Sequence, residues 1–502
     1  MSENAASRER SKWLESCSFV QIFRTFRLAI HPTKLALALV GLLLTLVWGG
    51  WLDWLWQRAD RGVTPDAIWV HAGFSEGAGQ PEGETAGVFE SWRRYEAWCL
   101  DSALASARHG QLWTSGLATV LESGPPGAGG RMPSVVSIGL APCVRLMGKG
   151  FAWLITQHWL FALLLLLGSL ALWALPGGAI CRIAAVQYAR DEKIAWRDAL
   201  GFAWQRYLSG FFLAPLLPVL LVLFVAFMLA LGGAFLRIPY VGDVLGSLLF
   251  VLAVLGGAVA ALIMIGMVAG GSLFWPTIAA EGSESLDAVS RSFNYVGTTP
   301  WRTLFYGLVA TVYGSLCYLF VKWFAYLILA CTHAFVGFGT APFGWWLYES
   351  GQAKLDVLWP APRFGELHPG VLETSGIETF SGAVVGIWVF LLILLVWAFL
   401  ASFYFCGSTV VYFLLRRDND TVDLEDVYLE DYAEEERAPT TAPPPQEQAA
   451  PQPGAEVQAT AESEPAPSAS PAGTEDSPQA DTEDSSDDKD DDSPPGPDEK
   501  AT

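Results

Sequence analysis

The sequence has few charged residues and lacks the short motifs that mark common enzymes. Charged residues make up 16% of the 502 residues. The chain contains no G-x-x-x-x-G-K-[ST] loop, no H-E-x-x-H, no G-x-S-x-G and no C-x-x-C. Its six histidines are scattered and predict no metal site, and no basic patch with interleaved aromatic residues points to nucleic acid. These absences favour a protein that is not an enzyme and that uses no metal and no cofactor.

Negative charge is scarce in most of the chain and concentrated at its C-terminus. The formal net charge is −21, and the segment from Asp418 to Thr502 alone holds 26 acidic and three basic residues. After about Arg437 this segment has no aromatic residue and many prolines. Such a composition cannot bury enough apolar surface to offset the entropy lost on ordering. We therefore expect residues 418–502 to form a disordered acidic tail on a nearly neutral, apolar body.

That body contains long apolar runs. A helix needs about 20 mostly apolar residues to cross the hydrocarbon core of a bilayer. Six stretches meet this length, at roughly 35–56, 151–175, 210–235, 244–270, 303–331 and 383–415. They predict an all-α integral membrane protein with six transmembrane helices. The first span begins late and has no small-residue cleavage site after it, so it is interpreted as a retained anchor.

Lysine and arginine in the connecting segments predict the orientation. The segment 1–34 is basic and amphipathic, and the connections between spans two and three and between spans four and five are also basic. These segments are therefore placed in the cytoplasm with both termini. The outer side then holds the loops 57–149 and 332–381, and residues 150–417 form the bundle of spans two to six. Residues 88–108 predict an amphipathic helix in the first loop, which also contains Cys99 and Cys143; whether they pair stays open.

The clearest pattern is an internal repeat with an offset of 89 residues. Both copies follow the pattern E-x5-D-A-x4-aromatic, and each comes after a Gly-Gly pair that ends a span. The first copy contains Glu192, Asp198, Ala199 and Trp204, and the second contains Glu281, Asp287, Ala288 and Phe293. We therefore expect two span–amphipathic helix–span units in tandem, with cytoplasmic connector helices at 190–207 and 283–297.

Two interpretations of the connector helices stay open. In the first, the helices lie beneath the bundle and have a structural role. In the second, their charged residues form a polar gate or an interaction face. The candidate residues are Glu192, Asp198, Glu281, Asp287, Arg197 and Arg291.

A resemblance to a known group of proteins rests on three segments, DALGFAW (198–204), DAVSRSF (287–293) and PWRTLF (300–305). Residues 170–335 resemble a group of uncharacterised bacterial multi-pass inner-membrane proteins. This group includes the membrane domain associated with glycerophosphodiester phosphodiesterases, whose catalytic domain has no counterpart here. The resemblance therefore implies a multi-pass protein of a bacterial inner membrane, without that enzymatic activity.

Small residues at a four-residue spacing predict close packing of helices. The candidate packing glycines are Gly242, Gly246, Gly266, Gly270, Gly382 and Gly386. Their spacing suits packing within one chain and also dimerisation.

Ionisable residues inside the spans are few. Lys322 lies toward the outer half of the fifth span, from which its long side chain can reach the outer surface, and no carboxylate lies well inside a span.

The sequence thus favours a non-enzymatic membrane protein that acts as a scaffold, a lipid-organising component or a partner-binding component. Its expected partners are membrane lipids and proteins that bind the acidic tail, and nucleic acid is not among them. The alternative is a transporter or permease for a small solute, with its path between the two repeats.

Overall fold

The computed structural model describes residues 18–74, 85–113, 137–344, 354–364, 377–420 and 427–428. Within these ranges the regular elements are helices joined by turns and short irregular segments, and one isolated bridge pairs Val63 with Ala86. The predicted disordered tail begins at Asp418, but the last helix, α16 (Ile377–Asp420), continues to Asp420 and residues 427–428 are held against the bundle, so the prediction is wrong for these residues. The rest of the predicted tail lies outside the described residues. Six helical segments are long and apolar enough to cross a membrane, namely 32–58, 159–190, 207–235, 241–281, 300–339 and 379–420. The predicted all-helical, multi-pass class is confirmed.

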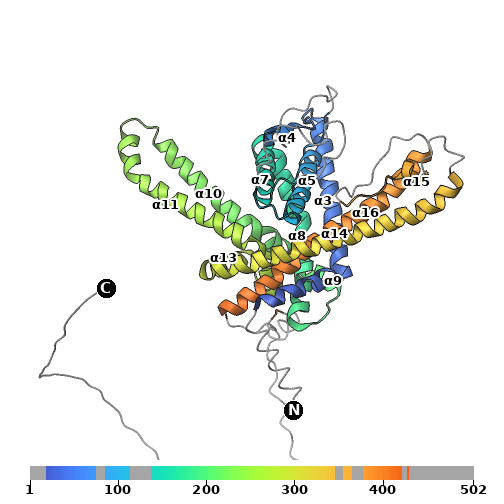
Figure 1. The fold of residues 1–502 in the computed structure, drawn as a ribbon. Helices are drawn as coiled ribbons and strands as arrows, with labels where there is room; N and C mark the ends of the chain where they lie inside the picture. The colour runs from blue at the N-terminus through green and yellow to red at the C-terminus, as the bar shows by residue number, and fades with distance from the viewer. Residues whose placement is uncertain are drawn as a thin grey trace, which may run out of the picture. The chain divides into compact units, whose positions relative to one another are not determined.

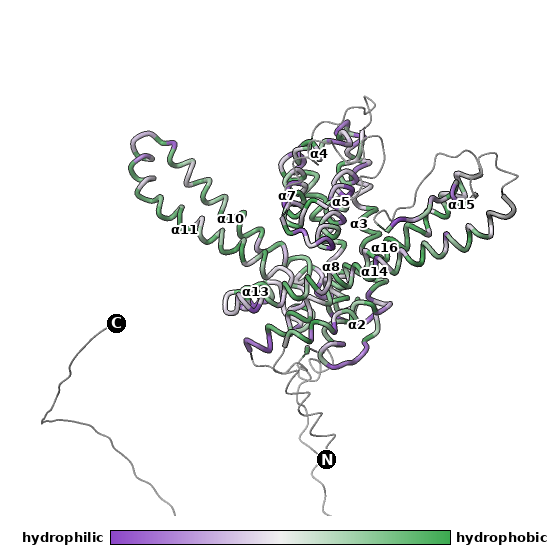
Figure 2. Tube along the Cα trace, viewed as in Figure 1, coloured by the Kyte–Doolittle hydropathy of each residue, from purple (hydrophilic) through white to green (hydrophobic). Residues whose placement is uncertain are grey.

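The helices follow one another along the chain in a simple order (Figure 1). They are η1 (Ser18–Arg24), α2 (Thr25–Ala29), α3 (Pro32–Arg58), α4 (Ala67–Ala72), α5 (Val88–Arg108), α7 (Leu140–Gln157), α8 (Trp159–Arg190), α9 (Trp196–Gln205), η2 (Tyr207–Phe212), α10 (Leu213–Phe235), α11 (Val241–Gly270), η3 (Gly271–Leu273), α12 (Phe274–Glu281), α13 (Ser285–Thr298), α14 (Pro300–Gly344), α15 (Lys354–Leu358) and α16 (Ile377–Asp420). Figure 2 shows that α10, α11, α14 and α16 are hydrophobic along most of their length. Many large apolar side chains on these helices are exposed, among them Leu248 and Val268, as expected of surfaces that face lipid.

Two buried cores organise the described residues. The larger core joins α3, α8, α9, α12, α13 and α16. We call the region formed by α9, α12, α13 and the last turns of α8 and α16 the connector end. The second core joins the end of α3, the start of α8 and the helices α4, α5 and α7. We call α4, α5 and α7 the loop subdomain, because they lie in the predicted outer loop.

Glycines facing tryptophans bring α3 and α8 close together. A Cβ atom on Gly168 would lie 2.2 Å from the ring of Trp48, and one on Gly41 would lie 3.1 Å from the ring of Trp173. Each tryptophan also donates a hydrogen bond across the interface: Trp48 to the carbonyl of Leu164 at 3.3 Å and Trp173 to Thr45 at 2.9 Å. Small residues opposite large ones allow this approach, since lipid gives no hydrophobic drive for helix association.

The second span differs from its predicted limits at both ends. The chain breaks at His158, so that α7 packs against α5 in the loop subdomain and the span begins at Trp159. At the other end the helix continues through Pro176, Gly177 and Gly178 to Arg190. Proline and glycine are tolerated in such helices because neighbouring groups compensate for them.

The connector helices are shorter than predicted, with α9 at Trp196–Gln205 and α13 at Ser285–Thr298. Their first residues are 89 positions apart, the offset of the sequence repeat, and Asp198 and Asp287 both lie in the first turn. The common origin of the two copies stays a prediction. The amphipathic helix predicted at 88–108 is α5, with the same limits.

Candidate functional site

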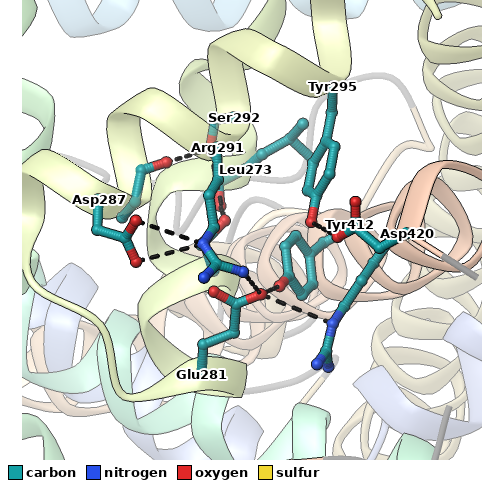
Figure 3. Close-up of polar contacts among 11 residues, drawn as sticks. Leu273, Glu281, Asp287, Arg291, Ser292, Tyr295, Tyr412 and Asp420 are labelled. Atoms are coloured by element: carbon teal, nitrogen blue, oxygen red, sulfur yellow. Dashed lines mark hydrogen bonds and ion pairs between the residues drawn. The ribbon is translucent and has the colours of Figure 1, made fainter. Parts of the chain in front are cut away.

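The predicted polar residues do not form one group. Glu281, Asp287 and Arg291 lie together at the connector end, where α12, α13 and α16 meet (Figure 3). Glu192 lies beyond the end of α8, where it lines a separate cavity. Asp198 is exposed, and Arg197 lies over the ring of Trp196 at 5.2 Å. Among the described residues, no ion pair joins the first-copy carboxylates to the second-copy cluster.

The separation has a local cause. In the first copy, α8 ends at Arg190 and the left-handed residue Asp191 turns the chain, which leaves Glu192 outside the helix and exposed. In the second copy, α12 continues to Glu281, and the left-handed residue Gly282 turns the chain, two positions later in the repeat than Asp191. Glu281 is therefore the last residue of a buried helix, with 9% of its side chain exposed.

Glu281 is contacted by side chains from two other helices, α13 and α16. Its Oε1 atom lies 3.0 Å from Nη1 of Arg291 and 3.6 Å from Nε of Arg416, and it accepts a hydrogen bond from the hydroxyl of Tyr412. Its Oε2 atom is buried and has no hydrogen-bond partner in the described part of the chain. Arg291 also pairs with Asp287 at 3.2 Å (Figure 3). We call this cluster, with Tyr295 and Asp420, the Glu281 clasp.

The clasp continues along the last turn of α16. Tyr295 of α13 donates a hydrogen bond to Asp420 at 2.5 Å, and Tyr306 of α14 donates one to Asp418 at 2.8 Å. Arg302 forms an ion pair with Asp418 at 3.2 Å. These contacts fix the end of the last span against the second repeat.

In the clasp, neighbouring charges and burial shift the pKa values of Arg291 and Tyr295, two residues that lie outside the membrane spans. Burial alone would lower the pKa of Arg291, but the carboxylates of Glu281 and Asp287 outweigh it and raise this pKa. Burial, together with the hydrogen bond to Asp420, raises the pKa of Tyr295. Arg291 therefore stays charged and Tyr295 stays a donor at neutral pH. This arrangement suits a fixed electrostatic clasp better than an open ion path, and the gate interpretation stays a prediction.

The carbonyl groups at the end of α12 are capped by groups distant in sequence. Arg182 donates to the carbonyl of Ala279 at 2.9 Å, and Arg206 donates to that of Gly282 at 3.1 Å. The backbone N–H of Tyr428 donates to the carbonyl of Ala280 at 3.0 Å. Cations at the C-terminal end of a helix offset its partial negative charge as well as its unpaired carbonyls.

Tyr428 is thereby held from several sides. Its carbonyl accepts a hydrogen bond from Nη2 of Arg182 at 2.7 Å, and its ring lies 5.1 Å from the guanidinium of Arg206. Gly282 leaves room for this ring, because a Cβ atom there would lie 2.8 Å from it. The preceding residue, Val427, is buried in the larger core. The segment that leads into the acidic tail is thus anchored beside the clasp.

Five of the six predicted packing glycines lie at contacts within the chain. Gly242 and Gly246 face the end of α10, where a Cβ atom on Gly242 would lie 2.6 Å from the carbonyl oxygen of Phe235. Gly266 faces the ring of Phe293 at 3.1 Å. The others are Gly270, which faces Val296, Gly382, which faces the carbonyl of Leu358, and Gly386 on α16. A role in dimerisation stays a prediction.

Several residues of the connector end were not singled out in the sequence. In the sequence, Arg182 falls in the basic connection between spans two and three, whereas the structure buries it within α8. Tyr412 falls in an apolar span, where nothing in the sequence marks it as a polar contact. The contact of Tyr428 with α12 spans about 150 residues and leaves no local pattern. Within the described ranges, no group of three or more His, Cys, Asp or Glu residues could hold a metal ion.

The fold and the clasp define a multi-pass helical membrane protein. No protein-family model matches the chain, and neither do any curated proteins or solved structures. The resemblance carried by DALGFAW, DAVSRSF and PWRTLF therefore stays a prediction.

Proposed function

We propose that the protein is a non-enzymatic membrane scaffold that presents its acidic C-terminal segment to a protein partner. The observation that carries the proposal is the anchoring of Tyr428. Its backbone N–H and carbonyl are bonded to Ala280 and Arg182, so the chain leaves the bundle at a fixed point. The residues that follow are strongly acidic, and such a segment attracts partners with a basic surface. Negative charge also repels anionic lipid, which favours binding away from the membrane.

The interior between the two repeats supports a scaffold over the alternative of a permease. The rings of Trp275 and Phe405 stack there with centroids 5.3 Å apart, and Phe211 contacts Trp275 edge-on at 6.2 Å. A Cβ atom on Gly177 would lie 2.3 Å from Trp275, so α8 approaches these rings closely. A permease needs a polar path to the middle of the membrane, and aromatic packing at the repeat interface opposes one.

The proposal places the connector end in the cytoplasm of a bacterial cell. This orientation is supported by the basic residues on η1 and α2 and around the end of α8, such as Arg24, Arg27, Arg190 and Lys193. The outer side would then hold the loop subdomain.

Affinity purification of the tagged protein, followed by mass spectrometry, tests the proposal. Three forms are compared: the full chain, a chain without residues 429–502, and a chain in which these residues are replaced by a Gly/Ser segment of equal length. We expect a stable partner with the full chain only, and its release at high salt because exposed charges are screened. The same set of partners with all three forms, or none with the full chain, would contradict a partner-binding tail.

A further inference from the structure

A cavity of about 970 Å³ opens beside the last turn of α8, away from the Glu281 clasp. Its wall is built by η1 and α2 on one side and by residues 187–192 on the other. This volume falls in the range of sites that enclose small-molecule ligands. The cavity lies where two candidate spans meet the polar boundary, since α3 begins at Pro32 and α8 ends at Arg190.

Charges of both signs line this cavity. Arg24, Arg27 and Arg190 contribute three guanidinium groups, and Asp191 and Glu192 contribute two carboxylates. Arg24 and Arg27 form no ion pair with any described carboxylate, and Asp191 and Glu192 form none with any described cation. The unpaired charges of Arg24 and Arg27 on one side and of Asp191 and Glu192 on the other suit a ligand that itself carries both signs. Guanidinium groups bind phosphate through parallel hydrogen bonds, and carboxylates accept hydrogen bonds from an ammonium group.

A buried cation lies behind the cavity wall. The side chain of Lys34 is fully buried, and its Nζ atom contacts only neutral groups among the described residues: Oε1 of Gln187 at 3.0 Å and Sγ of Cys406 at 3.8 Å. Gln187 is itself part of the cavity wall. A buried ammonium without an anionic partner is unfavourable, and an anion held beside Gln187 would offset part of that cost. Burial and the charges of Lys34 and Lys193 also lower the pKa of His31, which indicates a positive potential in this region.

Part of the remaining wall is apolar. Phe23 and Leu28 border the cavity, and η1 and α2 lie against the spans α14 and α16. Acyl chains could therefore follow the apolar wall while the headgroup meets the charges. Basic pockets between spans are known to favour lipid headgroups.

We propose that this cavity binds the headgroup of a phospholipid that carries both a phosphate and a primary ammonium, as in phosphatidylethanolamine. The arginines hold the phosphate, with Lys34 as a remote counter-charge, and Asp191 and Glu192 hold the ammonium. The assignment is independent of the proposed partner-binding role of the acidic tail.

Lipid titrations of the full chain, delipidated in detergent and followed by native mass spectrometry, test the proposal. The ligands are phosphatidylethanolamine, phosphatidylglycerol, which has the phosphate without the ammonium, and free phosphoethanolamine. We expect phosphatidylethanolamine to bind at least fivefold more tightly than phosphatidylglycerol. Equal affinity for the two lipids would overturn the two-charge assignment. Free phosphoethanolamine that binds as tightly as the lipid would overturn the assignment to a lipid.

Paired substitutions assign the two halves of the site. The Arg24→Gln/Arg27→Gln variant should bind phosphatidylethanolamine at least tenfold more weakly. The Asp191→Asn/Glu192→Gln variant should lose the preference for phosphatidylethanolamine and keep the binding of phosphatidylglycerol. The control is Arg197→Gln/Asp198→Asn, which removes one charge of each sign from exposed positions outside the cavity wall and should change neither affinity.

Two single substitutions keep the test decisive if a double variant does not fold. Arg27→Lys keeps the charge and removes the planar fork, and Lys34→Met removes the buried charge at similar side-chain length. Each should weaken binding of phosphatidylethanolamine at least threefold, and Lys34→Met should not lower the thermal stability of the lipid-free protein. Unchanged lipid affinity in both variants would overturn the proposal.

Discussion

The ion pair between Lys322 and Asp101 offers a quantitative test of how the loop subdomain is attached. Lys322 belongs to the span α14, and Asp101 belongs to α5, 221 residues earlier. Their Nζ and Oδ1 atoms are 2.5 Å apart, with 10% of the lysine side chain and 25% of the aspartate side chain exposed. Leu104 of α5 packs against the same region of α14 and α16. Lys322 is thus neutralised within the chain and does not need to extend to the outer surface.

The two single substitutions should have unequal effects. Asp101→Asn leaves a nearly buried ammonium without its counter-ion, which costs about 3 kcal/mol at such sites. Lys322→Met leaves a carboxylate that is more exposed and can turn toward water, so we expect a cost of about 1 kcal/mol. The double variant removes both charges and should be less destabilised than Asp101→Asn alone, because an apolar pair can replace a buried ion pair at little cost.

Thermal unfolding in detergent, followed by tryptophan fluorescence, measures these differences. At about 2 °C per kcal/mol, Asp101→Asn should lower Tm by roughly 6 °C. The control is Arg94→Gln on the same helix, whose ion pair with Glu90 is exposed and should change Tm by less than about 2 °C. Hydrogen exchange should increase in α5 of Asp101→Asn and stay unchanged in α13. Additive effects of the two single substitutions would refute the reasoning.

Two further predictions concern a buried carboxyl group and a close helix contact. Burial raises the pKa of Glu96 in α5 to about 8, and the neighbouring Trp92 side chain opposes this rise only in part. Because the folded state holds this proton more tightly, stability should fall as pH rises from about 4.5 through 8, and Glu96→Gln should flatten the dependence of Tm on pH; an unchanged slope would contradict this. Gly177→Ala places a methyl group against Trp275 and should cost about 2 kcal/mol, whereas Gly201→Ala, which meets open space, should stabilise by about 0.5 kcal/mol; equal Tm values for the two variants would be the contrary result.

The sequence predicted best those helices whose limits depend on residues close together in the chain. The limits of α5 follow from the amphipathic spacing of 88–108 and its flanking breaks, and the six spans follow from length and hydropathy alone. The second span was misplaced because hydropathy does not distinguish burial against protein from burial in lipid. The apolar residues of α7, such as Leu146 and Trp153, are buried within the loop subdomain.

The candidate site was predicted only in part, and the reason is the distance between its parts in sequence. Glu281, Asp287 and Arg291 are close in the chain, and the repeat pointed to them. Tyr412 and Arg416 come from the last span, and nothing near them in sequence indicates a carboxylate 131 residues away. Equating Glu192 with Glu281 assumed that both helices end at the same place, but in the repeat register α12 ends two positions later than α8, which separates the surroundings of the two glutamates.

Three buried cations show how the structure deals with charge among its spans, and their comparison points to the lipid cavity. Lys322 has a carboxylate partner in Asp101. Arg182 has carbonyl partners at the C-terminal end of α12, where partial negative charge accumulates. Lys34 is the most deeply buried of the three, and its partners in the described residues are a neutral amide and a thiol. Because a buried charge without a counter-ion is unfavourable, an anion held in the proposed lipid cavity, whose wall includes Gln187, would offset part of the cost of burying Lys34.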